Sequence, residues 1–380
     1  MTLPACVADY RALAKRRLPR LLFDYIDGGA YAEITLRRNV EAFEAIRLRQ
    51  RVMRDVSNIC LATEVFGEAL SMPVVLAPVG LSGMYARRGE VQAARAAEAA
   101  GITSCLSTVS ICSLEEVGAG VTRPPWFQLY MIKDRAYMAD LLAIAREGGT
   151  PVLVFTVDLP MPGSRYREVR SGMTGGLSTW GRIRRAFDAG RRPDWLLDVY
   201  LGGRPHTFGN LVKAVPDARD PSEFWVWVKR NFDTAVTWDD LAWVRKHWPG
   251  PIVVKGIMDV EDARSALASG ADGLVVSNHG GRQLDGVPAS VEALPAIAEA
   301  VGDKMTVLVD GGIRSGLDVV KALALGAKAC LIGRAWAYPL AARGGTGVAH
   351  MLELLRQETI TAMALTGCTD VHKAGRDLLV

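Results

Sequence analysis

A histidine between a polar run and two glycines stands out in the stretch SNHGGRQLDG (277–286). Imidazole exchanges protons near neutral pH, so His279 is a candidate base. Asp158, which ends a separate apolar run, is a candidate to hold and charge this imidazole. Arg165 and Arg282 suit bidentate binding of a substrate carboxylate. These residue types indicate abstraction of a proton close to a carboxylate.

Two glycine-bearing segments near the end of the chain, DGGIRSG (310–316) and IGRA (332–335), predict a phosphate site. Glycine turns let backbone N–H groups close around a phosphate, and Arg314 and Arg334 add positive charge. Turn glycines alone would not explain why both segments also carry an arginine. A base, a carboxylate clamp and a phosphate-anchored cofactor together indicate oxidation at the carbon next to a carboxylate.

Lys255 lies near the end of the apolar run 251–256, so a position on the surface is not expected. A fixed cation there could stabilise negative charge on a reduced cofactor ring. The alternative is a Schiff-base lysine of an aldolase-like enzyme, which borohydride trapping would detect. A non-enzymatic phosphate-binding or scaffold module is a third hypothesis, but it leaves His279, Arg165 and Arg282 without a role.

The elements that must position these residues follow a repeating pattern. Short apolar runs alternate with amphipathic segments, several of which end in glycine, the usual residue after a helix. Continuous apolar strands alternating with helices indicate parallel pairing. The runs are 72–78, 102–107, 126–130, 151–158, 251–256, 273–278, 306–312 and 328–334, and the helical segments include 88–101, 134–149, 237–248, 260–270 and 316–326.

Eight such units predict a (β/α)8 barrel, with a doubly wound open sheet as the structural alternative. A barrel of this kind carries its active site at the carboxyl ends of its strands. Most of the polar candidates fall at those ends, so they should meet at one mouth. They are Gln128, Tyr130, Thr156, Asp158, Lys255, Ser277, His279, Asp310, Gly311, Gly312, Gly333 and Arg334.

We expect a single domain over 1–380, in which residues 71–158 and 237–380 form the barrel. Residues 1–70 predict an extension that caps one barrel end, with a helix over about 7–27 and then an irregular segment. Residues 159–236 are a long insertion rich in Arg, Gly and Trp, including 181–195 and 223–230. Such an insertion is typical of an active-site lid or of a peripheral membrane contact, where Arg meets anionic headgroups and Trp sits at the interface.

Composition limits the class of protein. A hydrophobic fraction of 49% and a charged fraction of 23% argue against disorder, and a net charge of +4 is too small to imply a nucleic-acid partner. The six cysteines include no C-x-x-C pair and are expected to be reduced thiols. The N-terminus has no apolar core of a signal peptide, and no apolar run reaches the length of a bilayer span. We therefore expect the cytoplasm or its membrane face, and no metal site.

The motif SNHGGRQLDG resembles the signature of FMN-dependent 2-hydroxy-acid dehydrogenases and oxidases. The resemblance extends over nearly the whole chain outside the insertion. Within the family, the chain is most similar to the quinone-linked respiratory L-lactate dehydrogenases, notably in two stretches. These are GGAYAEITLRRN (28–39) and APVGLSGMYARRGE (77–90), and further matching segments are 106–110, 126–130, 155–167, 253–257, 310–327 and 332–335.

The resemblance implies FMN as the cofactor and a role for each matching position. His279 is the base, supported by Asp158, and Lys255 lies at the flavin N1–C2 carbonyl edge. The substrate is held by Tyr25, Tyr130, Arg165 and Arg282. Pro78, Val79 and Gly80 pass near the flavin N5; Ser107, Gln128 and Thr156 bind the ring; Asp310 contacts the ribityl chain; Gly312, Arg314, Gly333 and Arg334 bind the phosphate; Ser277 and Gly311 complete the cofactor set.

The reaction implied by the resemblance is oxidation of L-lactate to pyruvate, with electrons passing through FMN to a quinone. Oxygen is the competing acceptor, and mandelate, glycolate or a longer 2-hydroxy acid is the competing substrate. His279 could take the hydroxyl proton while hydride moves from C2, or could take the C2 proton itself. The resemblance also implies a homo-oligomer, a tetramer, held peripherally on the cytoplasmic face of the inner membrane. Many members carry Ala at the position of Gly80.

Overall fold

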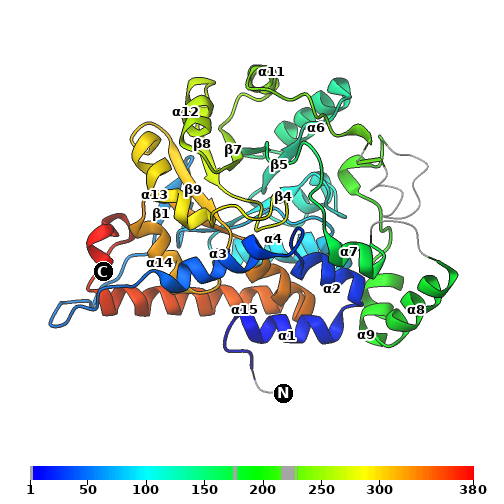
Figure 1. The fold of residues 1–380 in the computed structure, drawn as a ribbon, viewed down its shortest axis with the longest axis horizontal. Helices are drawn as coiled ribbons and strands as arrows, with labels where there is room; N and C mark the ends of the chain where they lie inside the picture. The colour runs from blue at the N-terminus through cyan, green and yellow to red at the C-terminus, as the bar shows by residue number, and fades with distance from the viewer. Residues whose placement is uncertain (1–2, 174–177, 215–226, 229) are drawn as a thin grey trace.

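The computed structural model of the chain describes residues 3–173, 178–214, 227–228 and 230–380. Its centre is a closed barrel of parallel strands in the order β10-β3-β4-β5-β6-β7-β8-β9, surrounded by helices (Figure 1). The strands are β3 Val74–Leu76, β4 Thr103–Ser107, β5 Trp126–Tyr130, β6 Leu153–Thr156, β7 Ile252–Ile257, β8 Gly273–Val276, β9 Thr306–Asp310 and β10 Ala329–Ile332. The predicted (β/α)8 barrel is confirmed, and the open sheet is excluded because β10 pairs with β3.

The strands are apolar along their whole length because both of their faces are buried. Side chains alternate between the two faces of a strand, so Val75 lies in the cluster inside the barrel while Val74 and Leu76 pack outward against the helices. Trp126 at the start of β5 is the largest fully buried side chain of the inner cluster. Each predicted apolar run contains one strand.

The helices that follow the strands are α4 Gly89–Ala99, α5 Leu114–Gly118, α6 Arg135–Glu147, α11 Asp239–His247, α12 Val260–Ala268, α13 Ser290–Val301, α14 Gly316–Ala324 and α15 Arg334–Thr366. The predicted glycine ends are confirmed, since Gly101, Gly149, Gly270 and Gly326 each adopt a positive φ just after a helix. Helix α15 bends where Arg343 and Gly344 leave helical geometry, and it runs along the outside of the barrel beside α1 (Figure 1).

The N-terminal extension differs from the prediction in two respects. The single helix expected over 7–27 is two helices, α1 Val7–Arg17 and α2 Arg20–Asp27, because Pro19 forces the preceding Leu18 into an extended conformation. The segment expected to be irregular holds a third helix, α3 Ile34–Ala45, and a hairpin of β1 Thr63–Val65 and β2 Glu68–Leu70.

The hairpin closes the amino-terminal end of the barrel. Val65 and Leu70 join the inner core, and the Phe66 ring packs edge-on against Trp126 at a centroid distance of 5.8 Å. At the opposite end, α2 brings Tyr25 to the mouth of the barrel. The extension therefore contributes to both ends of the barrel, with the hairpin at one end and Tyr25 at the other.

The insertion between β6 and α11 contains the helices α7 Tyr166–Ser171, α8 Thr179–Gly190 and α9 Pro193–Trp195, followed by the turns η2 Leu196–Leu201 and η3 Gly209–Leu211. Figure 1 shows α8 and α9 at the edge of the molecule, away from the strands. Trp195 anchors this region because its indole N–H donates to the carbonyl oxygen of Met84. Of the predicted Trp-rich stretch 223–230, only Trp227, Val228 and Arg230 lie within the described residues.

Candidate active site

A cavity opens at the carboxyl ends of the barrel strands. It is bounded by most of the residues predicted for the site: Tyr25, Pro78, Val79, Gly80, Ser107, Tyr130, Arg165, Lys255, His279, Arg282, Asp310, Gly311, Gly312, Arg314, Gly333 and Arg334. The other four predicted residues, Gln128, Thr156, Asp158 and Ser277, do not line the cavity. The described lining holds five cationic side chains and one carboxylate, which favours an anionic ligand.

His279 is paired with Asp158. The imidazole Nδ1 lies 2.9 Å from Oδ1 and 3.1 Å from Oδ2 of the carboxylate. Burial would raise the pKa of Asp158, but His279 and Lys255 outweigh it and the pKa is lowered, so the carboxylate is ionised and can only accept. Nδ1 therefore carries the shared proton, and the lone pair of Nε2 is left to act as a base.

Burial lowers the pKa of His279 from its usual value of 6.5, and the attraction of Asp158 opposes this shift. The imidazole is therefore neutral at pH 7, which is the state that a base requires. Asp158 still stabilises the imidazolium that forms when His279 takes a proton. The geometry and the charge state together support the predicted base.

The backbone around His279 is held in an uncommon conformation. His279, Gly280 and Gly281 follow one another with positive φ values of 57°, 64° and 72°, and such values are costly for histidine. Two side chains hold the turn: Ser277 Oγ accepts the N–H of His279 at 3.0 Å, and Asn278 Oδ1 accepts that of Gly281 at 3.0 Å. The paired glycines allow the turn that aims the imidazole at the cavity.

Arg165 and Arg282 lie together in the lining of the cavity. The Arg165 Nε donates to the Arg282 carbonyl oxygen at 3.2 Å, and the Arg282 guanidinium carbon sits 4.7 Å from the centre of the Tyr25 ring. Burial and the nearby Arg282 lower the pKa of Arg165, with Glu168 opposing. Two adjacent guanidinium groups beside a base match the predicted carboxylate clamp.

Lys255 is a fixed cation. Its Nζ lies 3.0 Å from Asp310 Oδ2 and donates to Ser277 Oγ at 2.9 Å. Burial would lower the pKa of Lys255, but Asp310 and Asp158 outweigh it and the pKa is raised. A Schiff-base lysine needs a neutral amine, so this environment argues against the aldolase hypothesis.

A glycine beside Lys255 lets strand β7 meet the catalytic pair. The register of β7 shifts between Lys255 and Ile257, which marks an irregularity at the carboxyl end of the strand. Gly256 has φ 114°, and a Cβ on it would lie 2.5 Å from the Cβ of Asp158. Only glycine allows this approach.

Three buried polar atoms at the strand ends have no partner among the described residues: Gln128 Nε2, Thr156 Oγ1 and Asp310 Oδ1. Ser107 Oγ donates to Gln128 Oε1 at 3.0 Å, so the amide is oriented with its N–H groups unused. Buried polar atoms are nearly always hydrogen-bonded in native proteins. Asp310 lines the cavity, and Gln128 and Thr156 lie at the same strand ends, so these atoms are candidates to bind a polar ligand.

The predicted phosphate loops follow β9 and β10. A Cβ on Gly312 would lie 1.9 Å from the carbonyl oxygen of Asn39, whereas one on Gly333 would meet open space. Arg334 donates to the carbonyl oxygens of Ile26, Gly28 and Gly280, at 2.8, 2.7 and 3.0 Å. Burial, aided by the nearby arginines, lowers its pKa to about 10. A bound anion would relieve this crowding of positive charge.

Gly80 leaves a narrow space beside Tyr25. A Cβ at this position would lie 2.8 Å from Val109 Cγ2 and 3.2 Å from the Tyr25 hydroxyl oxygen. Alanine at this position would therefore require Val109 to move. Glycine at this position fits the packing of this chain.

Several residues of the site were not predicted from the sequence. Val109, Leu159, Pro162 and Phe232 also line the cavity, and Phe232 packs on Tyr130 with ring centroids 5.0 Å apart. Val109, Leu159 and Pro162 lie in matching segments, but their apolar side chains carry no chemical signal, and Phe232 belongs to the insertion. Glu168 contacts both Arg165 and Arg282, and its spacing of three residues from Arg165 in a helix was the available signal.

A base beside a carboxylate clamp, at the mouth of a barrel with an anion site, defines a hydroxy-acid oxidoreductase that uses a phosphate-bearing cofactor. The chain belongs to the FMN-dependent dehydrogenase family, whose profile matches residues 14–380. The cofactor is FMN, and the three unpartnered polar atoms and the two glycine loops fit its ring, ribityl chain and phosphate.

The chain is similar to proteins named L-lactate dehydrogenase in several bacteria. It is 56% identical over 371 residues to that of Caulobacter sp. (strain K31), covering 98% of this chain and 97% of the relative. It is 55% identical over 372 residues to that of Chromohalobacter salexigens, covering 98% and 94%.

Among solved structures, the chain resembles two enzymes that act on mandelate. A monotopic membrane protein, (S)-mandelate dehydrogenase, superposes with a TM-score of 0.93 at 37% identity and covers 100% of both chains. A mandelate oxidase bound to (S)-4-hydroxymandelic acid gives 0.85 at 39% identity, covering 98% of both chains. The chain therefore shares its fold with these two enzymes.

Proposed function

We propose that this enzyme oxidises L-lactate to pyruvate and passes the electrons to a respiratory quinone. The observation that carries the proposal is the convergence of the His279–Asp158 pair and the two arginines on one cavity. The substrate is proposed from the relatives, which are named L-lactate dehydrogenase at 56% identity over nearly the whole chain.

In the proposed reaction, Arg165 and Arg282 bind the substrate carboxylate and Tyr25 and Tyr130 border the rest of the molecule. This orients C2 and its hydroxyl toward His279. Bound FMN supplies an acceptor for the two electrons that leave C2. His279 Nε2 takes the hydroxyl proton, or the C2 proton in the carbanion route, and Asp158 stabilises the imidazolium. Lys255, charged and buried, would offset negative charge on the cofactor when it is reduced.

The test is anaerobic reduction of the purified enzyme with a panel of L-2-hydroxy acids. Yellow protein that L-lactate bleaches faster than L-mandelate or glycolate supports the proposal. Colourless protein after loading with FMN contradicts it, and so does failure of every hydroxy acid to bleach the flavin. Mixing the reduced enzyme with a quinone or with oxygen then identifies the acceptor.

L-Mandelate is the second candidate substrate. The observation in its favour is the similarity to (S)-mandelate dehydrogenase, with a TM-score of 0.93. Higher identity to the lactate enzymes favours lactate, since the mandelate enzyme is only 37% identical. Bleaching by L-mandelate at a higher kcat/KM than by L-lactate would reverse this order.

A quinone acceptor is consistent with a membrane-binding surface on α8. Trp180, Ile183 and Phe187 are spaced three and four residues apart, so they lie on one face of this helix, and they are 77%, 53% and 65% exposed. Arg182, Arg184 and Arg185 on the same helix add positive charge around this face. An exposed apolar face with a basic surround is typical of a helix lying in a membrane interface.

We propose that α8 attaches the enzyme to the cytoplasmic face of the inner membrane. Among the described helices, none is long and apolar enough to cross a bilayer. Replacement of Trp180, Ile183 and Phe187 by serine should release the enzyme from vesicles containing anionic lipid while lactate still bleaches the flavin.

The matched control replaces three apolar residues that are exposed elsewhere, Val52, Met53 and Leu365. Equal vesicle binding by the two triple variants would contradict the attachment of α8. The predicted homotetramer stays a prediction. Sedimentation of the variant with serine at positions 180, 183 and 187, in the absence of detergent, would test it.

A further inference from the structure

Glu168 lies behind the carboxylate clamp, in the first turn of α7. Its side chain is only 3% exposed, and it is not part of the cavity wall. Helix α7 begins directly after Arg165, so the spacing of three residues places Glu168 on the same side of the helix as Arg165. A carboxylate this deeply buried requires partners.

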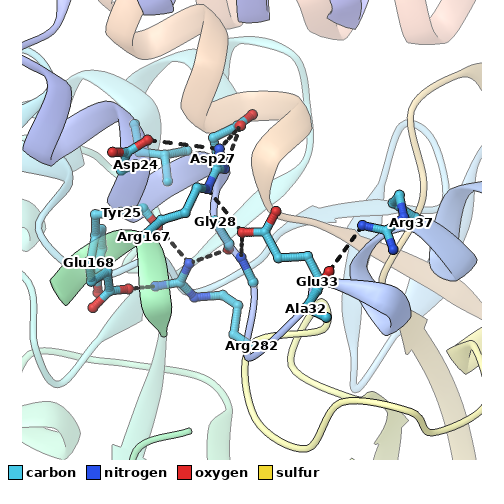
Figure 2. A network of polar contacts seen from close by, with 12 residues as sticks. Asp24, Tyr25, Asp27, Gly28, Ala32, Glu33, Arg37, Arg167, Glu168 and Arg282 are labelled. Atoms are coloured by element: carbon cyan, nitrogen blue, oxygen red, sulfur yellow. Dashed lines mark hydrogen bonds and ion pairs between the residues drawn. The ribbon is translucent and has the colours of Figure 1, made fainter. Parts of the chain in front are cut away.

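Both arginines of the clamp contact one oxygen of Glu168. Arg165 Nη1 donates to Oε1 at 3.2 Å, and Arg282 Nη2 donates to the same oxygen at 3.0 Å. Figure 2 shows the Arg282 guanidinium extended between Glu168 and the backbone around Gly28. The carboxylate therefore links two guanidinium groups that come from separate loops and fixes how they face the cavity.

The charges in this cluster can be counted. Arg165 and Arg282 contribute two positive charges and Glu168 one negative charge, so the clamp carries one net positive charge before a substrate binds. Two guanidinium groups side by side repel each other in a buried site, and the carboxylate offsets that repulsion. One substrate carboxylate then brings the cluster to neutrality. A second negative charge on the substrate would have no counterpart there.

Helix α7 is itself anchored, so Glu168 has a fixed position. The neighbouring Arg167 donates to Asp27 Oδ2 from both terminal nitrogens, at 2.8 and 2.6 Å, and to Glu33 Oε1 at 2.9 Å. Figure 2 shows Arg167 between these carboxylates of the N-terminal extension. Arg167 thus connects α7 to the N-terminal extension, and the adjacent Glu168 connects α7 to the two arginines of the clamp.

We propose that Glu168 is a positioning residue that also sets the charge selectivity of the site, so that the enzyme takes substrates with one carboxylate in preference to those with two. The inference rests on the proposed function, because it assumes that Arg165 and Arg282 bind the substrate carboxylate. The inference adds Glu168 to the residues that determine substrate specificity, although Glu168 does not touch the substrate and acts through the charge of the clamp.

The test uses two inhibitors of nearly the same shape, oxamate with one negative charge and oxalate with two. Their dissociation constants for the FMN-loaded enzyme are measured at pH 7 from the change that each causes in the flavin absorbance. Glu168→Gln keeps the size of the side chain and an acceptor oxygen but leaves the clamp with two positive charges. The ratio of the oxamate to the oxalate constant should rise on the order of tenfold, since an added charge favours the dianion.

Glu168→Asp separates position from charge. It keeps the negative charge but withdraws it by one methylene, so both guanidinium groups lose their contact geometry. Both inhibitors should bind several-fold more weakly, with the ratio of their constants unchanged. Glu90→Gln is the control, since Glu90 is also buried, accepts the Ile111 N–H at 2.9 Å and lies outside the clamp. Its two constants should match those of the native enzyme.

Each result has a definite meaning. An oxamate-to-oxalate ratio in Glu168→Gln within twofold of the native value overturns the charge selectivity. If Glu168→Gln does not retain FMN, Glu168→Asp decides, and native binding of both inhibitors by that variant overturns the inference. Failure of the native enzyme to bind either inhibitor would instead contradict the proposed function.

Discussion

His279 depends on its neighbours for the role of base. Asp158 fixes the proton on Nδ1 of His279. Ser277, together with Gly280 and Gly281, holds a backbone conformation that a histidine seldom adopts. Sequence reasoning could find the histidine and its carboxylate partner because both follow apolar strands. It could not find the strained turn, since only the packed loop requires positive φ at three residues in a row.

Replacing His279 with Gln should leave the protein yellow and abolish fast bleaching by L-lactate. Glutamine keeps similar bulk but has no basic nitrogen, so the rate of flavin reduction should fall by about 10²–10⁴-fold. Stopped-flow absorbance of the anaerobic enzyme measures this rate. His247→Gln on α11 is the control and should reduce at the native rate. A native rate in His279→Gln would remove this residue from the role of base.

The pH dependence of flavin reduction follows from the direction of the His279 pKa. Burial lowers that pKa below 6.5, so kcat/KM should fall as the pH drops through a value below 6.5 and be level above it. Asp158 raises the pKa of His279, so Asp158→Asn should move this acid limb to lower pH. The plateau rate should also fall, by about 10²–10⁴-fold, because the imidazolium loses its counterion. A limb that moves to higher pH contradicts the pairing.

Among the elements, α7 connects the insertion to the extension. Arg167 lies among carboxylates from α2 and the following loop, and Asp27 also accepts the Tyr338 hydroxyl at 2.7 Å and contacts Arg11. The insertion was predicted as a lid or a membrane contact. Its first helix contacts both Arg165 and Arg282 through Glu168, while α8 carries the exposed apolar face, and the lid and the membrane contact stay predictions.

Arg167→Met should loosen α7 and weaken substrate binding. Asp27 keeps Arg11 and Tyr338, so the free energy of unfolding should fall by about 1–2 kcal/mol, less than for an orphaned buried charge. KM for L-lactate should rise, because Glu168 and the clamp depend on the position of α7. Denaturant unfolding and steady-state kinetics measure the two effects.

Arg170→Met is the matched control on the same helix. Arg170 is exposed and lies 5.8 Å from the centre of the Tyr166 ring, so its loss should change the free energy of unfolding by less than about 0.5 kcal/mol. Equal changes in the two variants would contradict the role of Arg167.

The barrel strands and their helices were predictable, because apolar runs bounded by glycines determine them locally. The extension and the insertion were less so. A proline at position 19 splits the first helix, α3 and the hairpin lack a strong period, and α7 is only six residues long. What these elements do depends on long-range ion pairs such as Arg167 with Asp27, which no local pattern encodes.

On the scale of the whole molecule, FMN should contribute to stability. The described cavity lining holds five cations and one carboxylate, so an anionic ligand that binds only the folded state stabilises it. At free FMN 100 times its Kd, the gain is about 2.7 kcal/mol. The midpoint of thermal unfolding should therefore fall when FMN is removed and recover when it is added back.

Inorganic phosphate should raise the midpoint of the FMN-free protein more than chloride at the same ionic strength, because Arg314 and Arg334 lie at the phosphate loops. Arg314→Met should reduce this difference. Equal effects of phosphate and chloride on the native FMN-free protein would argue against a phosphate site there.

The pairing of β10 with β3 has a consequence for the making of the enzyme. Strand β3, the first of the barrel, pairs with β10, which the ribosome delivers more than 250 residues later. Arg334 begins the helix that follows β10. A nascent chain released before residue 334 lacks both the closed wall and one of the phosphate arginines. The yellow colour of bound FMN should thus appear only when synthesis is nearly finished. The absorbance of bound flavin in a cell extract therefore measures full-length chains and excludes truncated ones.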